Sequence, residues 1–529
     1  MMHFRTCFSV AALASLTLLS GAALAAPSVI HEVKNDTSAP LSLLAAAGGS
    51  PSVPGDGGGN MHLAGPTGAQ LSGGTANPVA AAPAGKLSSF GLGLAFEGQS
   101  ANDNRALLNG VAYVPPDTNG AVGSKQYVQT VNVTFAVYDK KTGARTLGPA
   151  LMTSLWSGFG GLCETQNGGD PVVLFDHLAN RWIITQLAYN NTLTDNHQCI
   201  AVSTSADATG TYYRYDYAFT GVFNDYPKFG IWPDAYYYTA NMFGQQFLGA
   251  LACAIDRNAM LIGKPANMIC VQNPASVASL LPADLDGATL PPAGEPESFI
   301  GIATGTSLNV FRMHPDFATP ANTTYTAGTI AVAPFNEICA RATALACIPQ
   351  PSPGERVDGL GDRLMFRLAY RNYGDHESLV VNHTVAGVPG GAVAGVRWYE
   401  IRNPAAPTVY QQGTIYDGTD NYWLGSVAMD KAGNLALGFS ASSHALYPSI
   451  YLAGRSPTDP LGQIRGPFVL ANGTGVQLNH SYNRWGDYSS MSVDPSDDCT
   501  FWYTQEYYIA SGIIDWTTRV SSFKFSSCR

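Results

Sequence analysis

The sequence predicts an all-β protein, a seven-bladed β-propeller of four-stranded antiparallel blades preceded by a disordered leader. Three observations lead to this fold class. A strand-turn-strand pattern repeats along most of the chain, helical periodicity is almost absent, and the composition is rich in turn and strand formers. The chain of 529 residues has 56 Gly, 26 Tyr and 22 Phe, and only 12% of its residues are charged.

The repeat is clearest in "NRWGDYSSMSVDPSDDCTFWYTQEYY", residues 483–508. An acid precedes an apolar strand, a polar turn follows, and a second strand ends on Glu506. First strands of this kind begin near residues 117, 170, 227, 297, 362, 426 and 487, at spacings of 53 to 70 residues. Each hairpin is followed by another strand pair, which makes four strands per unit and seven units. We expect the innermost strands to include residues 172–175, Met429 and residues 491–493.

The N-terminal region predicts export. Residues 1–25 have one basic residue, Arg5, then an apolar core and a small-residue cleavage site, as in a secretory signal peptide. Residues 26–100 are rich in Ala, Gly, Pro and Ser, and predict a flexible linker. Residues 101–529 form the propeller domain, with a short helix possible at residues 274–281. No later apolar run is long enough to span a membrane, so we expect a secreted, extracellular or periplasmic monomer.

Charge excludes one class of partner. Without residues 1–25 the chain has 27 basic and 38 acidic residues, a balance of −11. A nucleic-acid-binding protein needs a basic face for the phosphates, so no nucleic acid is expected as a partner.

The cysteines predict disulfides. Eight remain after the signal peptide, with no CxxC pair or zinc-finger spacing, and an even number in an exported chain indicates disulfide bonds. Of the 105 possible pairings we favour the sequential one, because each pair closes a short loop. These pairs are Cys163–Cys199, Cys253–Cys270, Cys339–Cys347 and Cys499–Cys528.

Two kinds of resemblance support the propeller. "SADATGTYY" (205–213) and "SPTDPLGQI" (456–464) resemble degenerate Asp-boxes, the hairpin motif of sialidase-type propellers, in which the Asp holds a turn. The stretch from "PPDTNGAVG" to "RWGDYSSMSVDPSDDCTFWYTQEY", with "DGLGDRLMFRLAYRNYGDHESLVVNH" and "GVRWYE", resembles a group of exported bacterial proteins over about four fifths of the chain. The resemblance implies a propeller fold and supplies no catalytic residues.

Propeller geometry sorts the polar residues. The segments that lead into innermost strands and those that leave second strands lie at one face, around a central funnel, so acids at these positions are expected to converge there. The candidate catalytic residues are Asp170, Asp362, Asp487, Glu506 and His383. The candidate substrate-binding residues are Asp117, Asp225, Asn241, Arg484 and Tyr507. Glu297 also stands before a predicted first strand.

Each of these residues also has a structural interpretation. An Asp before a strand often caps free backbone N–H groups, Arg484 could form a structural salt bridge, and His383 could bond to a loop carbonyl. A second cluster, Arg371, Asp375, His376 and Glu377, is expected at a hairpin turn away from the funnel. No cofactor and no protein metal site are predicted, although Ca²⁺ could bind among the acids.

The predicted function is the binding or cleavage of an extracellular carbohydrate at the funnel, by a hydrolase or lyase type of reaction. Carboxylates crowded around one channel shift each other's pKa values, and glycoside cleavage uses such a pair. Tyr and Trp side chains suit sugar stacking, and they equally suit packing between blades. The alternative is a non-catalytic scaffold for adhesion or protein binding.

Overall fold

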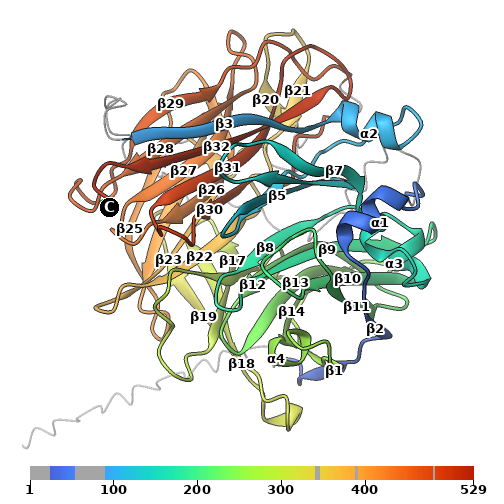
Figure 1. Ribbon diagram of the computed structural model, residues 1–529. Coiled ribbons are helices and arrows are strands. Elements are labelled where there is room, and N and C mark those ends of the chain that lie inside the picture. The colour runs from blue at the N-terminus through green and yellow to red at the C-terminus, as the bar shows by residue number, and fades with distance from the viewer. Residues whose placement is uncertain (1–23, 54–89, 340–345, 388–390, 480–482) are drawn as a thin grey trace, which may run out of the picture.

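The computed structural model describes residues 24–53, 90–339, 346–387, 391–479 and 483–529, and almost every element in it is a β-strand (Figure 1). Runs of β-branched and aromatic residues form the strands, and Gly, Asn and Asp occupy the turns between them. Of the predicted signal peptide, residues 1–23 lie outside the described residues.

Among the described residues, three sheets have four strands each. The first contains β4 (Asn119–Val122), β5 (Gln126–Val131), β6 (Thr134–Asp139) and β7 (Arg145–Leu151). The second contains β26 (Asn421–Met429), β27 (Leu435–Ser442), β28 (Ser449–Arg455) and β29 (Arg465–Ala471). The third contains β30 (Ser490–Val493), β31 (Thr500–Tyr508), β32 (Trp516–Phe525) and β3 (Phe90–Ser100).

Two further sheets have a fifth strand from the N-terminal region. One contains β8 (Val172–Asp176), β9 (Arg181–Tyr189), β10 (Asn196–Ser203), β11 (Tyr212–Ala218) and β2 (Lys34–Thr37). The other contains β12 (Phe223–Ile231), β13 (Ala235–Phe243), β14 (Phe247–Asp256), β15 (Met268–Gln272) and β1 (Ser28–Ile30).

The remaining large sheet joins two groups of four strands. They are β16 (Leu281–Asp286), β17 (Glu297–Thr304), β18 (Ser307–His314) and β19 (Thr324–Ala331), then β22 (Met365–Asn372), β23 (Glu377–Ala386), β24 (Ala394–Arg402) and β25 (Thr408–Ile415). The groups meet where β16 pairs with β22 in parallel. A separate pair consists of β20 (Ala346–Pro349) and β21 (Arg356–Asp358). The helices are short: α1 (Leu41–Ala47), α2 (Ala101–Leu107), η2 (Met152–Trp156), α3 (Gly161–Thr165), α4 (Arg257–Met260) and η3 (Pro320–Asn322).

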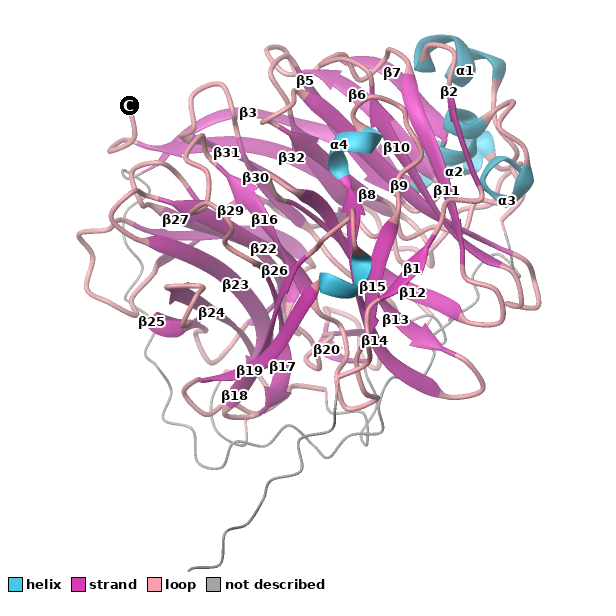
Figure 2. Ribbon diagram, turned by 90° about the horizontal axis from the view of Figure 1, so that it is seen from below, coloured by secondary structure: helices cyan, strands magenta, loops and turns pink. Residues whose placement is uncertain are grey.

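The first strands of these groups contact one another in chain order. β4 contacts β8, and the series continues through β12, β16, β22 and β26 to β30, which contacts β4 again. The sheets spread outward from these strands (Figure 2). Residues 172–175, Met429 and residues 491–493 lie in first strands, as predicted.

One first strand was predicted wrongly. The sequence pattern indicated a first strand near residue 297 and a possible helix at residues 274–281, but Leu281–Asp286 is the first strand, β16, and Glu297 begins the second, β17. The hairpin pattern misses β16 because only two of its residues pair with β17, whereas four pair in parallel with β22, which is far along the chain. Glu297 is fully buried and accepts a hydrogen bond from the Ala283 amide.

The structure also differs from the predicted linker at residues 26–100. Ser28–Ile30 pairs with β15, Lys34–Thr37 pairs with β11, Leu41–Ala47 is helical, and Phe90–Ser100 pairs with β32 (Figure 1). The three strand segments gain order by pairing with strand edges far along the chain, which local composition does not encode. Residues 54–89 lie outside the described residues.

The sequential disulfide pairing is confirmed for all four pairs in the described chain. Cys499 precedes β31 and Cys528 follows β32, so this bond ties the last strand to its own sheet. Disulfides persist in oxidising compartments, which fits an extracellular protein. In the part of the chain that the structure describes, no helix has the length and apolar character needed to cross a membrane.

The two Asp-box-like turns are held as predicted. Asp207 Oδ1 accepts a hydrogen bond from the Thr209 amide at 2.9 Å, and Asp459 Oδ2 accepts one from the Ser456 amide at 2.8 Å. Both contacts hold local turns, and membership of the sialidase group stays a prediction.

Candidate functional site

Acidic residues gather where the first strands begin. Asp117 lies two residues before β4, Asp170 two residues before β8, Asp362 three residues before β22 and Asp487 three residues before β30. Asp225 lies within β12, at a break in its register with β13. The acids interact electrostatically, since Asp117 and Asp225 each experience the charges of Asp170 and Asp487. The predicted convergence of these carboxylates is therefore present.

Hydrogen bonds hold the backbone of this cluster. Asn132 Nδ2 donates to Asp117 Oδ2 at 2.9 Å, and Asn132 Oδ1 accepts from the Asp170 amide at 2.9 Å. Asp117 Oδ1 accepts from the Asp487 amide at 2.9 Å. Asp117 and Asp170 both adopt left-handed backbone angles, with φ of 50° and 49°, which Asp tolerates better than most residues. Asp117 therefore acts as a buried cap, its structural interpretation, and is too buried to bind a substrate.

Two guanidinium groups pair with acids of the cluster. Arg484 forms ion pairs with Asp487 and, at 3.2 Å, with the buried Asp358. Arg363 Nε donates to Asp362 Oδ1 at 2.8 Å. Arg484 thus lies beside Asp487 as predicted. It is only 7% exposed and is paired with carboxylates of the protein, so it holds Asp487 in place and does not contact a substrate.

Within this cluster, Asp170 and Asp225 are the partly exposed acids with raised pKa values. Burial raises the pKa of Asp225 to about 7, and the charges of Asp170 and Asp487 act in the same direction. Burial raises the pKa of Asp170 to about 6, while the nearby Lys228 ammonium opposes the rise. Burial and the charge of Asp487 raise the pKa of Asp117 well above its usual range. Neighbouring carboxylates therefore titrate near neutral pH, as in many acid–base sites.

Lys228 lies at the centre of the cluster and is fully buried. Its Nζ atom is 3.4 Å from the centre of the Tyr226 ring and 4.3 Å from that of Tyr488, and it donates to the Pro227 carbonyl at 3.0 Å. Burial lowers the pKa of Lys228 to about 8, although the charges of Asp170, Asp117 and Asp487 favour the ammonium. Lys228 was not predicted as a site residue, and its available signal was its alternation with Tyr226 next to Asp225 in β12.

Two residues that were predicted to be catalytic, Glu506 and His383, are buried instead of exposed at the funnel. Glu506 is fully buried, and its Oε1 accepts from the Gly486 amide, so it lies beneath Asp487 and out of reach of solvent. Burial raises the pKa of Glu506 well above its usual range. His383 is also fully buried, with Nε2 2.9 Å from the Tyr399 hydroxyl, and burial lowers its pKa well below the ordinary value. Strand position predicted which end they occupy, and packing from neighbouring sheets decided their burial.

Two predicted substrate-binding residues have structural partners instead. Asn241 Nδ2 donates to Ser279 Oγ at 3.0 Å, and Asn241 Oδ1 accepts from the Ser279 amide at 2.7 Å. The Tyr507 hydroxyl donates to Glu97 of β3 at 2.9 Å, because the ring extends toward the outer strand of its sheet. Arg371, Asp375, His376 and Glu377 lie at the far end of the β22–β23 hairpin from Asp362, and Arg371 pairs with Asp498 at 2.7 Å.

No group of three or more His, Cys, Asp or Glu side chains in the described ranges is arranged to hold a metal ion. The possibility of Ca²⁺ stays a prediction.

No family model and no curated protein matches this chain. Among solved structures, it is similar to an α-L-arabinofuranosidase from Fusarium graminearum, with 8% identity, 79% of this chain and 95% of that chain covered, and a TM-score of 0.35. The polysaccharide lyase Uly1 has 9% identity, coverage of 94% and 99%, and a TM-score of 0.34. The WD40 domain of SCAP from fission yeast has 9% identity, coverage of 78% and 85%, and a TM-score of 0.28. At these scores the similarities do not assign a function.

Proposed function

We propose that this chain is a secreted seven-bladed propeller that cleaves an extracellular carbohydrate at the carboxylate cluster, by acid–base catalysis. The ring is the closed series of contacts from β4 to β30 and back to β4, with β3 as the outer strand of the last blade. The cluster lies where the first strands begin, which is where a propeller has its funnel.

One observation carries the chemistry: Asp170 and Asp225 are partly exposed neighbours with pKa values of about 6 and about 7. Near pH 6.5, about midway between those values, the pair holds one proton, so one carboxyl group can protonate a leaving oxygen while the other acts as a base. We assign the acid role to Asp225, which has the higher pKa, and the base role to Asp170. Lys228 keeps Asp170 ionised, and Asp362 and Asp487 form the rest of the wall.

Hydrolysis follows if Asp170 activates water while Asp225 protonates the glycosidic oxygen. The C–O bond then breaks, and the water oxygen joins the sugar carbon. This reaction needs two carboxyl groups and water, both of which a partly exposed site supplies.

The test is incubation of the purified protein with a panel of polysaccharides, followed by mass spectrometry. Products that carry the mass of one added water indicate hydrolysis, and unsaturated products indicate a lyase. Asp225→Asn should retain glycan binding and lose products. If both proteins bind a glycan and neither gives products, the non-catalytic scaffold is favoured. If the unchanged protein shows no binding and no products, the proposal is contradicted.

A further inference from the structure

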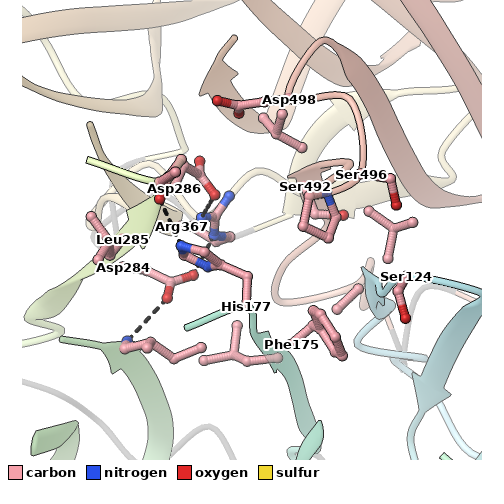
Figure 3. Close-up of a pocket in the computed structure, with 18 of the residues that line it drawn as sticks. Ser124, Phe175, His177, Asp284, Leu285, Asp286, Arg367, Ser492, Ser496 and Asp498 are labelled. Carbon is pink, nitrogen blue, oxygen red and sulfur yellow. Dashed lines mark hydrogen bonds and ion pairs between the residues drawn. The ribbon is translucent and has the colours of Figure 1, made fainter. Parts of the chain in front are cut away.

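A cavity lies at the opposite end of the first strands from the carboxylate cluster. It has a volume of about 320 Å³ and is lined by residues near the far ends of β4, β8, β12, β16 and β30, together with Arg367 of β22 (Figure 3). The carboxylate cluster precedes β8 at Asp170, whereas Phe175 and His177 line this cavity from the other end of the same strand. The two sites therefore occupy different ends of one ring of strands.

Charged groups form one side of the cavity, and serines lie across from them (Figure 3). Arg367 pairs with Asp284 at 2.5 Å and with Asp286 at 2.7 Å, and its Nη1 donates to the Met491 carbonyl at 3.0 Å. Asp284 Oδ1 accepts from the Ile231 amide at 3.0 Å. Arg367 and Asp284 are 4% and 3% exposed, so their arrangement is fixed by the fold.

This side carries an excess of negative charge. The carboxylates of Asp284 and Asp286 share the one guanidinium group of Arg367. The carboxylate of Asp498 is neutralised separately, by a bidentate ion pair with Arg371 at 2.8 and 2.7 Å. Asp286 Oδ2 and Ser492 Oγ are two of the buried side-chain atoms in the described ranges that have no hydrogen-bond partner. Buried polar atoms usually have a partner, so these two atoms leave hydrogen-bond acceptor capacity unused beside the cavity.

The rest of the cavity lining favours a ligand with an apolar part. Leu174, Phe175, Ile231 and Leu285 contribute carbon surface. His177 Nε2 is 2.7 Å from the Gly287 carbonyl, so it carries the proton, and Nδ1 of a neutral ring is an additional acceptor. The cavity thus combines acceptors, net negative charge and apolar walls in a volume suited to a small molecule.

We propose that this cavity binds a small organic cation, an ammonium group on a short apolar chain. The ammonium donates to Asp286 Oδ2 and Ser492 Oγ and neutralises the excess carboxylate, and the chain packs on Phe175 and Leu285. A neutral alcohol offers one donor and no charge, and no three His, Cys, Asp or Glu side chains among the described residues are arranged to hold a metal ion.

Isothermal calorimetry with n-butylammonium and, as the neutral match, n-butanol tests this proposal on the whole protein. Butylammonium should bind at least about tenfold more tightly than butanol, because only the ammonium makes a charge-assisted bond. Asp286→Asn should weaken butylammonium binding at least about tenfold. The matched control is Asp375→Asn, the same change at a side chain that is 82% exposed, and it should leave binding unchanged.

A second variant guards against misfolding of Asp286→Asn. Ala288 is exposed at the rim of the cavity, so Ala288→Trp leaves the core intact and should block the ligand. Equal affinity for the amine and the alcohol, no binding of either, or amine binding that survives Ala288→Trp would each overturn the proposal. Because the cavity is separate from the carboxylate cluster, carbohydrate cleavage should be unaffected by Ala288→Trp.

Discussion

Asp225 is the residue on which the proposed chemistry depends most. A general acid contributes roughly 10²- to 10⁴-fold to a rate, so Asp225→Asn should lower turnover by about that factor. The melting temperature should be unchanged or higher, since the variant replaces a carboxylate whose ionisation is opposed by burial. Steady-state kinetics and a thermal melt give both values.

Asp375→Asn, an exposed change of the same kind, serves as the control and should leave both quantities unchanged. Full turnover by Asp225→Asn would remove Asp225 from the acid role.

Lys228 is expected to set the acidic limb of the activity profile. Its ammonium opposes the rise in the pKa of Asp170, so Lys228→Met, which retains a similar length, should raise that pKa above about 6. The acidic limb of kcat/KM should then move to higher pH, and the basic limb should move less, because Lys228 is a smaller influence on Asp225 than on Asp170.

The exposed Lys141→Met is the matched control, with the profile expected to stay in place. An acidic limb that does not move in Lys228→Met would show that this ammonium does not act on the base.

At the scale of elements, the last sheet combines β3 from the N-terminal region with β30, β31 and β32 from the end of the chain. The Cys499–Cys528 bond stabilises its β31–β32 part. Replacing both cysteines by Ser should lower the free energy of unfolding by about 2–5 kcal/mol, because the unfolded chain regains loop entropy. Urea denaturation measures the change.

The Cys339–Cys347 pair provides a comparison, since it closes a span of 8 residues instead of 29. Its removal should cost less, because loop entropy grows with the length of the closed loop. A larger loss for the shorter loop would contradict this account.

At the scale of the whole molecule, the carboxylate cluster makes stability depend on pH. Asp170 and Asp225 have folded-state pKa values of about 6 and about 7, above the unfolded value near 4. Between about pH 4 and pH 7 the folded state keeps protons that the unfolded chain releases, so these groups make the protein less stable as pH rises.

Asp225→Asn should therefore gain stability relative to the unchanged protein as pH rises through this window. Urea denaturation of both proteins at about pH 4.5 and about pH 7.5, which together span most of this window, measures the difference in their free energies of unfolding. A difference between the two proteins that is the same at both pH values would show that the pKa of Asp225 is not raised.

Much of this protein was predictable from local sequence. Strand alternation and turn residues predicted the hairpins, because both act over a few neighbours. Short loops predicted all four disulfides, and the position of Asp117, Asp170, Asp225, Asp362 and Asp487 near the beginning of first strands predicted their convergence.

Only the tertiary structure decided the rest. β3 finds its partner β32 more than 400 residues along the chain, and β16 is defined by a parallel neighbour, so neither is encoded in its own pattern. Asp225 is partly exposed while Glu506 is fully buried, although one lies near the beginning of β12 and the other near the end of β31, at the same end of their hairpins. Burial depends on what other sheets place above a side chain, and burial, more than position in the strand, sets whether a carboxyl group can meet a substrate.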